Sequence, residues 1–253
     1  MAFFKTNDHE GEELLLFFTR QGLTGEALDF AVKEAKRELF EGKPLAYITK
    51  EAYFYDRAFY VDEAVLIPRP DTEHIAEKAI GLLPQGAVFA DLGTGSGCIA
   101  VTVLAHRPDV SGFAVDLSKD ALRVAERNAR DAGVLDRLTL VHGDMIENPL
   151  GDTRLDLVIS NPPYIPTRDI ASYPSLRYEP RMALDGGEDG MDFYRAILSG
   201  YQKNLCPKEV FLFEIGFDQG NAIRALAERG GFTAEVYKDY GKNDRVALLY
   251  RKA

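Results

Sequence analysis

Residues 91–97 read Asp91-Leu92-Gly93-Thr94-Gly95-Ser96-Gly97 and follow an apolar run that begins at Ala87. The run predicts a buried strand over 87–91, and the apolar residues behind the glycines predict a helix through about residue 106. Glycine lets the backbone approach a ligand closely, and the first turn of a helix has backbone N–H groups without intrahelical partners. The stretch therefore predicts a strand–loop–helix turn with a ligand at the carboxyl end of the strand.

The same alternation of strand and helix continues to the C-terminus. Such alternation implies a parallel sheet with right-handed crossovers and helices on both faces. The last two strands are joined by a short turn, which predicts one antiparallel strand in an otherwise parallel sheet. We therefore expect an α/β fold with a mostly parallel seven-stranded sheet. The further strands are expected over 111–115, 138–141, 155–160, 210–215, 234–239 and 245–250, with helices over 117–132, 192–203 and 218–229.

Two smaller parts precede this region. Residues 1–43 carry apolar side chains at helical spacing, which predicts a small helical domain, either a plain bundle or a docking site for a partner. Residues 45–67 are rich in aromatic and β-branched side chains and predict a β-hairpin. The expected division is a helical domain over 1–43, a hairpin linker over 44–70 and a catalytic domain over 71–253.

The linker ends in Ile67-Pro68-Arg69-Pro70, whose prolines hold the backbone extended. In that position Arg69 could reach over a neighbouring site, or the segment could be a plain linker into the next helix. Asp71 or Thr72 is expected to cap that helix, which would run to about residue 83.

The composition excludes several classes of protein. The formal charge is −10, which counts against direct binding of nucleic acid. No apolar run approaches the roughly 20 residues of a membrane span, and no signal peptide is expected. Two cysteines provide no disulfide framework, and the four scattered histidines have no metal-ligand spacing. A cytoplasmic protein without a metal or a membrane partner is expected.

Acidic residues after successive strands indicate the ligand. Asp116 ends the next strand, 116 − 91 = 25 residues after Asp91, where a carboxylate can hold both hydroxyls of a ribose. Asp91 could meet an ammonium group, and Asp144 with Met145 could hold an adenine. The dinucleotide fingerprint needs Gly or Ala where this chain has Cys98, and a Walker A loop is absent. A ligand with ribose, adenine and ammonium but no phosphate fits S-adenosylmethionine.

Another short motif, Asn161-Pro162-Pro163-Tyr164, follows the apolar run 155–160. Each proline removes a backbone N–H, so the loop is rich in acceptors. Together with an amide oxygen and an aromatic face, such a loop suits a substrate –NH2 group, although a strand followed by a proline-rich turn is the alternative.

The expected site is assembled from these motifs. Asn161, Pro162 and Tyr164 are expected to be catalytic, and Pro163 and Arg69 to bind the substrate with them. Cys98 is not expected to be a nucleophile because no histidine lies near it in the sequence. The expected cofactor-binding residues are Asp91, Gly93, Thr94, Gly95, Ser96, Gly97, Asp116, Leu117, Asp144, Met145 and Asn161.

The glycine loop and the four-residue motif together resemble class I methyltransferases that act on planar amino groups. Further segments make the chain similar to the peptide chain release factor glutamine N5-methyltransferases, the PrmC/HemK family, from about residue 23 to the C-terminus. These segments are 66–73, 178–190, 214–216, 219–220, 238–241 and 244–246.

The resemblance implies a Rossmann-like class I methyltransferase fold and methylation of the glutamine amide in the Gly-Gly-Gln motif of bacterial class 1 release factors. It implies that the 93–97 loop, Asp116 and Asn161 bind S-adenosylmethionine, which becomes S-adenosylhomocysteine. Met145 falls where the family has an aromatic residue that contacts the cofactor. The helical segment before residue 44 is shorter than is usual in the family.

Two other functions are compatible with the motifs. A flipped adenine, cytosine or guanine presents the same planar –NH2, so the chain could methylate a nucleic-acid base. A catalytically silent cofactor-binding subunit is the other alternative, and the intact Asn161 argues against it. The charged segment 178–190, with Glu179, Arg181 and Asp185, could be a lid over the substrate or a solvated turn.

Overall fold

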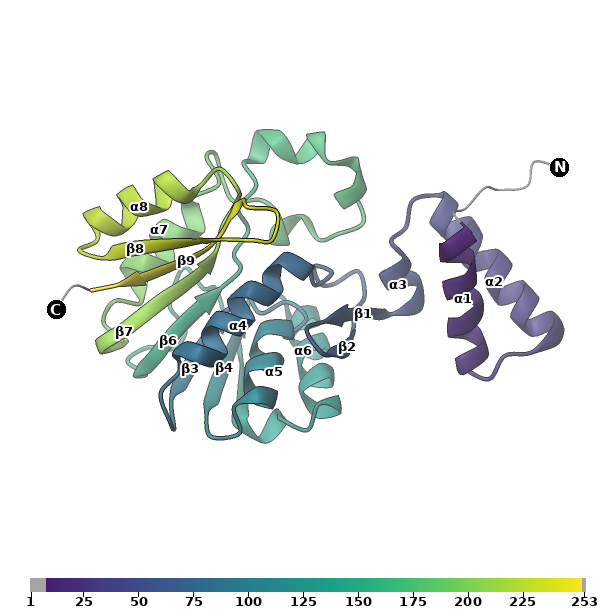
Figure 1. Cartoon of the computed structure of the whole chain (residues 1–253), viewed down its shortest axis with the longest axis horizontal. Coiled ribbons are helices and arrows are strands. Elements are labelled where there is room, and N and C mark those ends of the chain that lie inside the picture. Colours follow the sequence, from purple (N-terminus) through teal and green to yellow (C-terminus); the bar gives the residue numbers. More distant parts are fainter. Residues whose placement is uncertain (1–7, 252–253) are drawn as a thin grey trace.

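The computed structural model describes residues 8–251. Figure 1 shows a sheet domain at one end of the molecule and a pair of helices at the other. These helices are α1 (Asp8–Arg20) and α2 (Gly25–Phe40), and the short helix α3 (Leu45–Thr49) follows them. A hairpin of β1 (Glu51–Phe54) and β2 (Arg57–Tyr60) then leads to the sheet domain. Residues 1–7 of the expected helical domain lie outside the described residues.

A seven-stranded sheet in the order β5-β4-β3-β6-β7-β9-β8 forms the centre of the larger part. Its pairings are parallel except those of β9, which runs antiparallel to β7 and β8, so the predicted sheet is confirmed. The strand order reverses between β3 and β6, and ligands bind at the carboxyl ends of strands at such a point. The strands are β3 (Val88–Leu92), β4 (Ser111–Asp116), β5 (Leu138–His142), β6 (Leu155–Ser160), β7 (Leu205–Glu214), β8 (Thr233–Lys238) and β9 (Asp244–Tyr250).

Strand β6 shows why the sheet lies between two layers of helices (Figure 1). Leu157 and Ile159 are buried on one face with residues of α4 and α5, whereas Val158 is buried on the other face with residues of α7 and α8. Because both faces are covered, the strand is apolar in sequence except at Asp156 and at its last residue, Ser160. The helices are α4 (Glu73–Leu82), α5 (Cys98–His106), α6 (Lys119–Asp131), α7 (Asp192–Gly200) and α8 (Gly220–Arg229).

Short 3-10 turns connect these elements, and three of them build the long segment between β6 and α7. They are η1 (Pro70–Thr72), η2 (Leu135–Arg137), η3 (Thr167–Ser172), η4 (Pro174–Leu176) and η5 (Arg181–Ala183).

The predicted hairpin over 45–67 was wrong at both ends. Tyr47 and Ile48 lie in α3, where the carbonyl of Pro44 accepts hydrogen bonds from both of their backbone N–H groups. The Tyr47 side chain is fully buried, and its hydroxyl donates to the carbonyl of Val65 at 2.6 Å. The strand pairing itself is confined to β1 and β2. Packing of Tyr47 against the distant segment therefore overrides its strand propensity.

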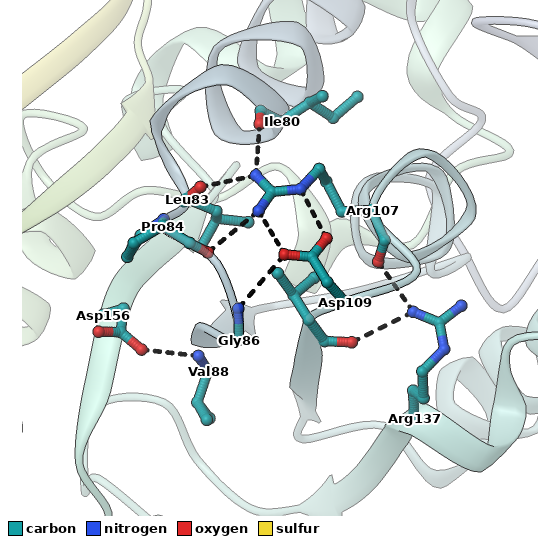
Figure 2. Close-up of polar contacts among 10 residues, drawn as sticks. Ile80, Leu83, Pro84, Gly86, Val88, Arg107, Asp109, Arg137 and Asp156 are labelled. Carbon is teal, nitrogen blue, oxygen red and sulfur yellow. Dashed lines mark hydrogen bonds and ion pairs between the residues drawn. The ribbon is translucent and has the colours of Figure 1, made fainter.

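A network of arginine hydrogen bonds lies at the end of the sheet where β3 and β4 begin (Figure 2). The Arg107 guanidinium donates to the carbonyls of Ile80, Leu83 and Pro84 at 2.6–3.0 Å. It also forms two hydrogen bonds with the Asp109 carboxylate, at 2.7 and 2.9 Å. One side chain thus holds the end of α4 and the turn into β3 against the start of β4.

Arg107→Met should lower the Tm by roughly 4–8 °C, because three carbonyl groups lose a charged donor at once. Thermal unfolding followed by circular dichroism measures the change. Arg123→Met is the matched control, because its partner is the exposed Asp120 on the same helix. Equal Tm losses in the two variants would contradict this role for Arg107.

Candidate active site

The carboxyl ends of β3, β4, β5 and β6 surround a cavity of about 190 Å³ that opens to solvent. Of the residues expected to bind the cofactor, all but Asp91 and Gly97 line it, and these two are buried. Of the residues expected to bind the substrate, Arg69, Asn161 and Pro163 line it. Pro162 and Tyr164 are not among the lining residues. The expected cofactor-binding residues that line the cavity are Gly93, Thr94, Gly95, Ser96, Asp116, Leu117, Asp144, Met145 and Asn161.

The glycine loop needs glycine for two different physical reasons. Gly97 precedes α5 with a φ of 78°, a left-handed conformation that side chains disfavour, and a Cβ there would lie 3.1 Å from the Cβ of Ala125. A Cβ on Gly93 would lie 2.9 Å from the Cε of Met145. Gly97 therefore lets α5 begin close to α6, and Gly93 leaves room for the Met145 side chain.

Asp116 at the end of β4 fixes this loop. One carboxylate oxygen accepts a hydrogen bond from the backbone N–H of Gly95 at 2.9 Å, and the other accepts from Ser118 at 2.8 Å. Burial is the main influence on the Asp116 carboxyl and raises its pKa, while these N–H groups oppose the shift. Each carboxylate oxygen has a second lone-pair site. The same side chain can therefore hold the loop and still accept hydroxyl groups.

Asp91 lies under the loop and is 1% exposed. Its Oδ2 accepts a hydrogen bond from the Thr94 hydroxyl at 2.7 Å, whereas its Oδ1 is buried without a hydrogen-bond partner among the described residues. Burial raises its pKa to about 7. A buried carboxylate oxygen of this kind can accept a hydrogen bond from a cationic partner, so Asp91 fits the ammonium group of S-adenosylmethionine.

Contacts from three directions fix the four-residue motif. The Asn161 side chain donates through Nδ2 to the Thr72 hydroxyl at 3.3 Å. The Tyr164 hydroxyl donates to Glu214 at 3.4 Å, and the Tyr164 carbonyl accepts from Gln219 at 3.1 Å. A Cβ on Gly190 would lie 2.3 Å from the Tyr164 carbonyl oxygen, so the following segment packs directly on the motif. The prolines in the middle of the motif are both buried.

The charged segment after β6 is tied to the linker. The Glu179 carboxylate is buried, pairs with Arg69 and accepts a hydrogen bond from the Ile67 backbone N–H at 3.1 Å. Arg181 and Asp185 pair with each other at 3.2 Å near the surface. The segment thus has one buried anchor and one solvated pair, so neither the lid nor the solvated turn describes all of it.

Comparisons with known proteins identify the family. Residues 74–172 match the model of the methyltransferase small domain. The release factor glutamine methyltransferase of Moorella thermoacetica is 43% identical over 216 residues, which are 83% of this chain and 76% of the relative. That of Bacillus anthracis is 36% identical over 248 residues, which are 92% of this chain and 85% of the relative.

The chain belongs to the release factor glutamine methyltransferase family. The resemblance seen in the motifs is thereby confirmed. A solved structure of a ribosomal protein L11 methylase from Lactobacillus delbrueckii subsp. bulgaricus is similar with a TM-score of 0.57 and 18% identity, over 76% of this chain and 84% of that chain. A methyltransferase from Pyrococcus furiosus is similar with a TM-score of 0.56 and 18% identity, over 76% of this chain and 87% of that chain. These similarities show the class I methyltransferase fold.

Three further properties concern the buried cysteine, metal binding and membrane spans. Burial raises the pKa of the Cys98 thiol to about 12, which makes it a poor nucleophile. Among residues 8–251, no group of histidine, cysteine and acidic side chains could hold a metal ion. Within the same part of the chain, no helix is long and apolar enough to cross a membrane.

Three residues that contact the motif were not among the expected site residues, namely Thr72, Glu214 and Gln219. Thr72 was expected as a possible helix cap, but no cap hydrogen bond forms from its side chain at the start of α4. Glu214 and Gln219 belong to segments that carried the resemblance. Membership of such segments was the one available signal, together with the place of Glu214 at the end of a buried strand and of Gln219 just before α8.

Proposed function

We propose that this chain transfers a methyl group from S-adenosylmethionine to the side-chain amide nitrogen N5 of the glutamine in the Gly-Gly-Gln motif of bacterial release factors. Membership of the release factor glutamine methyltransferase family supports the reaction. The observation that carries the geometry is the hydrogen bond from Asn161 Nδ2 to Thr72, 3.3 Å long. It turns the amide nitrogen inward, so that the amide oxygen is the group available to a substrate.

The cofactor would lie along the residues that line the cavity. Asp116 would accept the ribose hydroxyls, Asp144 and Met145 would hold the adenine, and Leu117 would pack beside it. Asp91 would balance the ammonium group from beneath the loop 93–97. Bound S-adenosylmethionine supplies an electrophilic methyl group.

The chain's own contribution is to position a weak nucleophile. The lone pair of an amide nitrogen is delocalised, so the nitrogen must be held out of that conjugation and in line with the methyl carbon. We assign the Asn161 amide oxygen and the Pro162 carbonyl as the acceptors for the two N–H groups of the substrate amide. Pro163, Tyr164 and Arg69 would contact the rest of the substrate glutamine. Such positioning can supply up to roughly 7–11 kcal/mol in the best models. A nitrogen–carbon bond forms, a sulfur–carbon bond breaks, and one amide proton leaves to water.

The division of the chain follows the same proposal. Residues 71–253 would carry the reaction, 44–70 would be the linker, and the helical part up to residue 43 would dock the release factor. The Tyr178 hydroxyl and Arg177 both donate to the carbonyl of Glu41, next to the end of α2. The segment that packs on the motif therefore also contacts the helical part, which supports docking close to the site.

Mass spectrometry of a purified release factor tests this function. After incubation with the enzyme and S-adenosylmethionine, one added methyl group is expected on the glutamine of its Gly-Gly-Gln motif. A parallel incubation with labelled cofactor and RNA or DNA tests the base methyltransferase. Label in nucleic acid and none in the release factor would reject the proposal, and no transfer at all would favour a silent subunit.

Cofactor affinity should depend on pH through Asp91. The ammonium partner needs the ionised carboxylate, and burial raises the pKa of Asp91 to about 7. Affinity should therefore fall by up to about tenfold for each pH unit below that value. Calorimetry between pH 5.5 and 7.5 measures the change, and Asp91→Asn should bind weakly with little pH dependence. The same pH slope in wild type and Asp91→Asn would contradict this role.

A further inference from the structure

Arg69 supplies the positive charge at the wall of the cavity. Among the described residues that line the cavity it is the one lysine, arginine or histidine, whereas Asp116 and Asp144 contribute carboxylates. Its side chain is 37% exposed, and its backbone is extended between two prolines. The surroundings of this one cation therefore decide whether the wall of the site attracts anions.

A buried carboxylate neutralises that cation. The Glu179 side chain is 2% exposed, and one of its oxygens pairs with Nη2 of Arg69. The other oxygen accepts a hydrogen bond from the backbone N–H of Ile67 at 3.1 Å. Both oxygens thus act as acceptors, which is the pattern of an ionised carboxylate. Arg69 and Glu179 together add no net charge to the wall.

We propose that Glu179 is a specificity-determining residue that suits the site to an uncharged peptide segment and disfavours the phosphates of a nucleic acid, an inference that rests on the proposed function. A flipped base and a glutamine side chain present the same planar –NH2 to Asn161. They differ in what is attached to them, because a nucleotide in a strand is flanked by charged phosphates and a Gly-Gly-Gln segment carries no charge. Groups around the motif must therefore discriminate between them, and Arg69 is such a group.

The pairing with Glu179 changes what Arg69 can recognise. An unpaired guanidinium holds a phosphate through two parallel hydrogen bonds and a full charge. With Glu179 at Nη2, one of the two terminal nitrogens is occupied, the charge is balanced, and a phosphate meets a second anion. A peptide carbonyl needs one N–H donor and no charge, and the Nε and Nη1 groups can still supply that donor.

The residues on both sides of Glu179 keep it beside Arg69. The Tyr178 hydroxyl donates to the carbonyl of Glu41 at 3.0 Å, next to the end of α2. Pro180, which follows Glu179, lines the cavity. Turning the carboxylate away from Arg69 would also leave a buried backbone N–H of the linker without its partner. The neutral pair is therefore a fixed part of the wall.

Binding of an oligonucleotide without amino groups tests the charge effect directly. A fluorescein-labelled single-stranded oligothymidylate supplies phosphates but no –NH2, and fluorescence anisotropy measures its Kd with S-adenosylhomocysteine present. Glu179→Gln should bind it roughly three- to tenfold more tightly than wild type at low salt, because Arg69 loses its counter-charge, and added salt should shrink the gain.

Asp152→Asn is the matched control for net charge. It makes the same change in charge and removes the partner of Lys203, but Asp152 precedes β6 at the end of the sheet opposite the cavity. Its affinity for oligothymidylate should stay within about twofold of wild type. Unchanged affinity in Glu179→Gln, or an equal gain in Asp152→Asn, would overturn the inference.

Arg69→Met shows whether the gain passes through the arginine. In the Glu179→Gln background it should return the oligothymidylate affinity to the wild-type level, and a gain that persists would overturn the inference. If Glu179→Gln does not fold, Arg69→Met alone decides. A neutralised Arg69 contributes nothing to phosphate binding, so unchanged affinity is expected, and a loss of more than about threefold would overturn the inference.

Release factor kinetics measure the other half of the discrimination. Glu179→Gln should raise the KM for the release factor roughly three- to tenfold, because Arg69 is no longer held where it donates to the peptide. The kcat and the Kd for the cofactor should change less than about threefold, since the contact binds substrate and transition state alike. A change confined to the cofactor Kd would overturn the inference.

Failure of this inference can be distinguished from failure of the proposed function, because oligothymidylate binding requires no methyl transfer. If the wild-type enzyme leaves the release factor unmethylated, the proposed function fails. If the wild-type enzyme methylates the release factor and Glu179→Gln gains no oligothymidylate affinity over the control, the inference alone fails.

Discussion

Asn161→Ala should lower kcat for release factor methylation by roughly 100- to 1000-fold, the loss seen when one preorganised polar contact to a reacting group is removed. The variant loses the acceptor that would hold one substrate N–H, and the amide nitrogen is then no longer aimed at the methyl carbon. Asn161 also lines the cofactor cavity, but it is one of many residues there. Cofactor affinity should therefore fall far less than kcat.

Single-turnover methylation of a release factor, combined with calorimetry for the cofactor, measures the two effects separately. Asn221→Ala is the matched control, because Asn221 is exposed on α8. The control should retain wild-type kcat. Near-normal turnover in Asn161→Ala would reject the assignment of Asn161, and a loss confined to cofactor affinity would make it a cofactor ligand only.

Asp116→Ala should weaken cofactor binding by roughly 30- to 100-fold, which corresponds to about 2–3 kcal/mol. Two losses add in this variant. The ribose hydroxyls lose a charged acceptor, and the backbone N–H groups of Gly95 and Ser118 lose the carboxylate that fixes the loop. At saturating cofactor, kcat should change much less than the affinity.

Calorimetry with S-adenosylmethionine or S-adenosylhomocysteine measures this change. Asp116→Asn should lie between wild type and Asp116→Ala, because it keeps one acceptor oxygen. Asp136→Ala removes an exposed carboxylate from η2 and should bind like wild type. Unchanged affinity in Asp116→Ala would show that the ribose is held elsewhere.

Most of the sheet could be predicted because each strand carries its own signal. A strand buried on both faces is a continuous apolar run, and β6 between two helical layers is an example. The short connection between β8 and β9 indicated the antiparallel strand, since a parallel connection needs a longer crossover. Tyr47 shows where such reasoning fails. Its side chain suits a strand, but a hydrogen bond to Val65 and burial place it in a helix.

Most residues at the carboxyl ends of the strands that line the cavity could be predicted for a similar reason. Each one ends a strand or lies in the turn that follows a strand, so a local pattern carries both its position and its chemistry. The contacts that hold Asn161 and Arg69 in place join residues far apart in the sequence, so no local pattern indicates them. Thr72 and Asn161 are 89 positions apart in the sequence, yet their side chains meet. Glu179 and Arg69 are 110 apart, and their pairing was not expected.

The sequence by itself determined the order of strands and helices, the glycine loop, the acceptor-rich motif and, through the resemblance, the family. Those features depend on residues that are neighbours along the chain, where periodicity and backbone conformation are set. Only the tertiary structure decided that Thr72 contacts Asn161, that Glu214 contacts Tyr164 and that Glu179 anchors Arg69. These contacts depend on how distant strands register in the sheet and on which helix packs over their ends, and no local stretch of sequence records that arrangement.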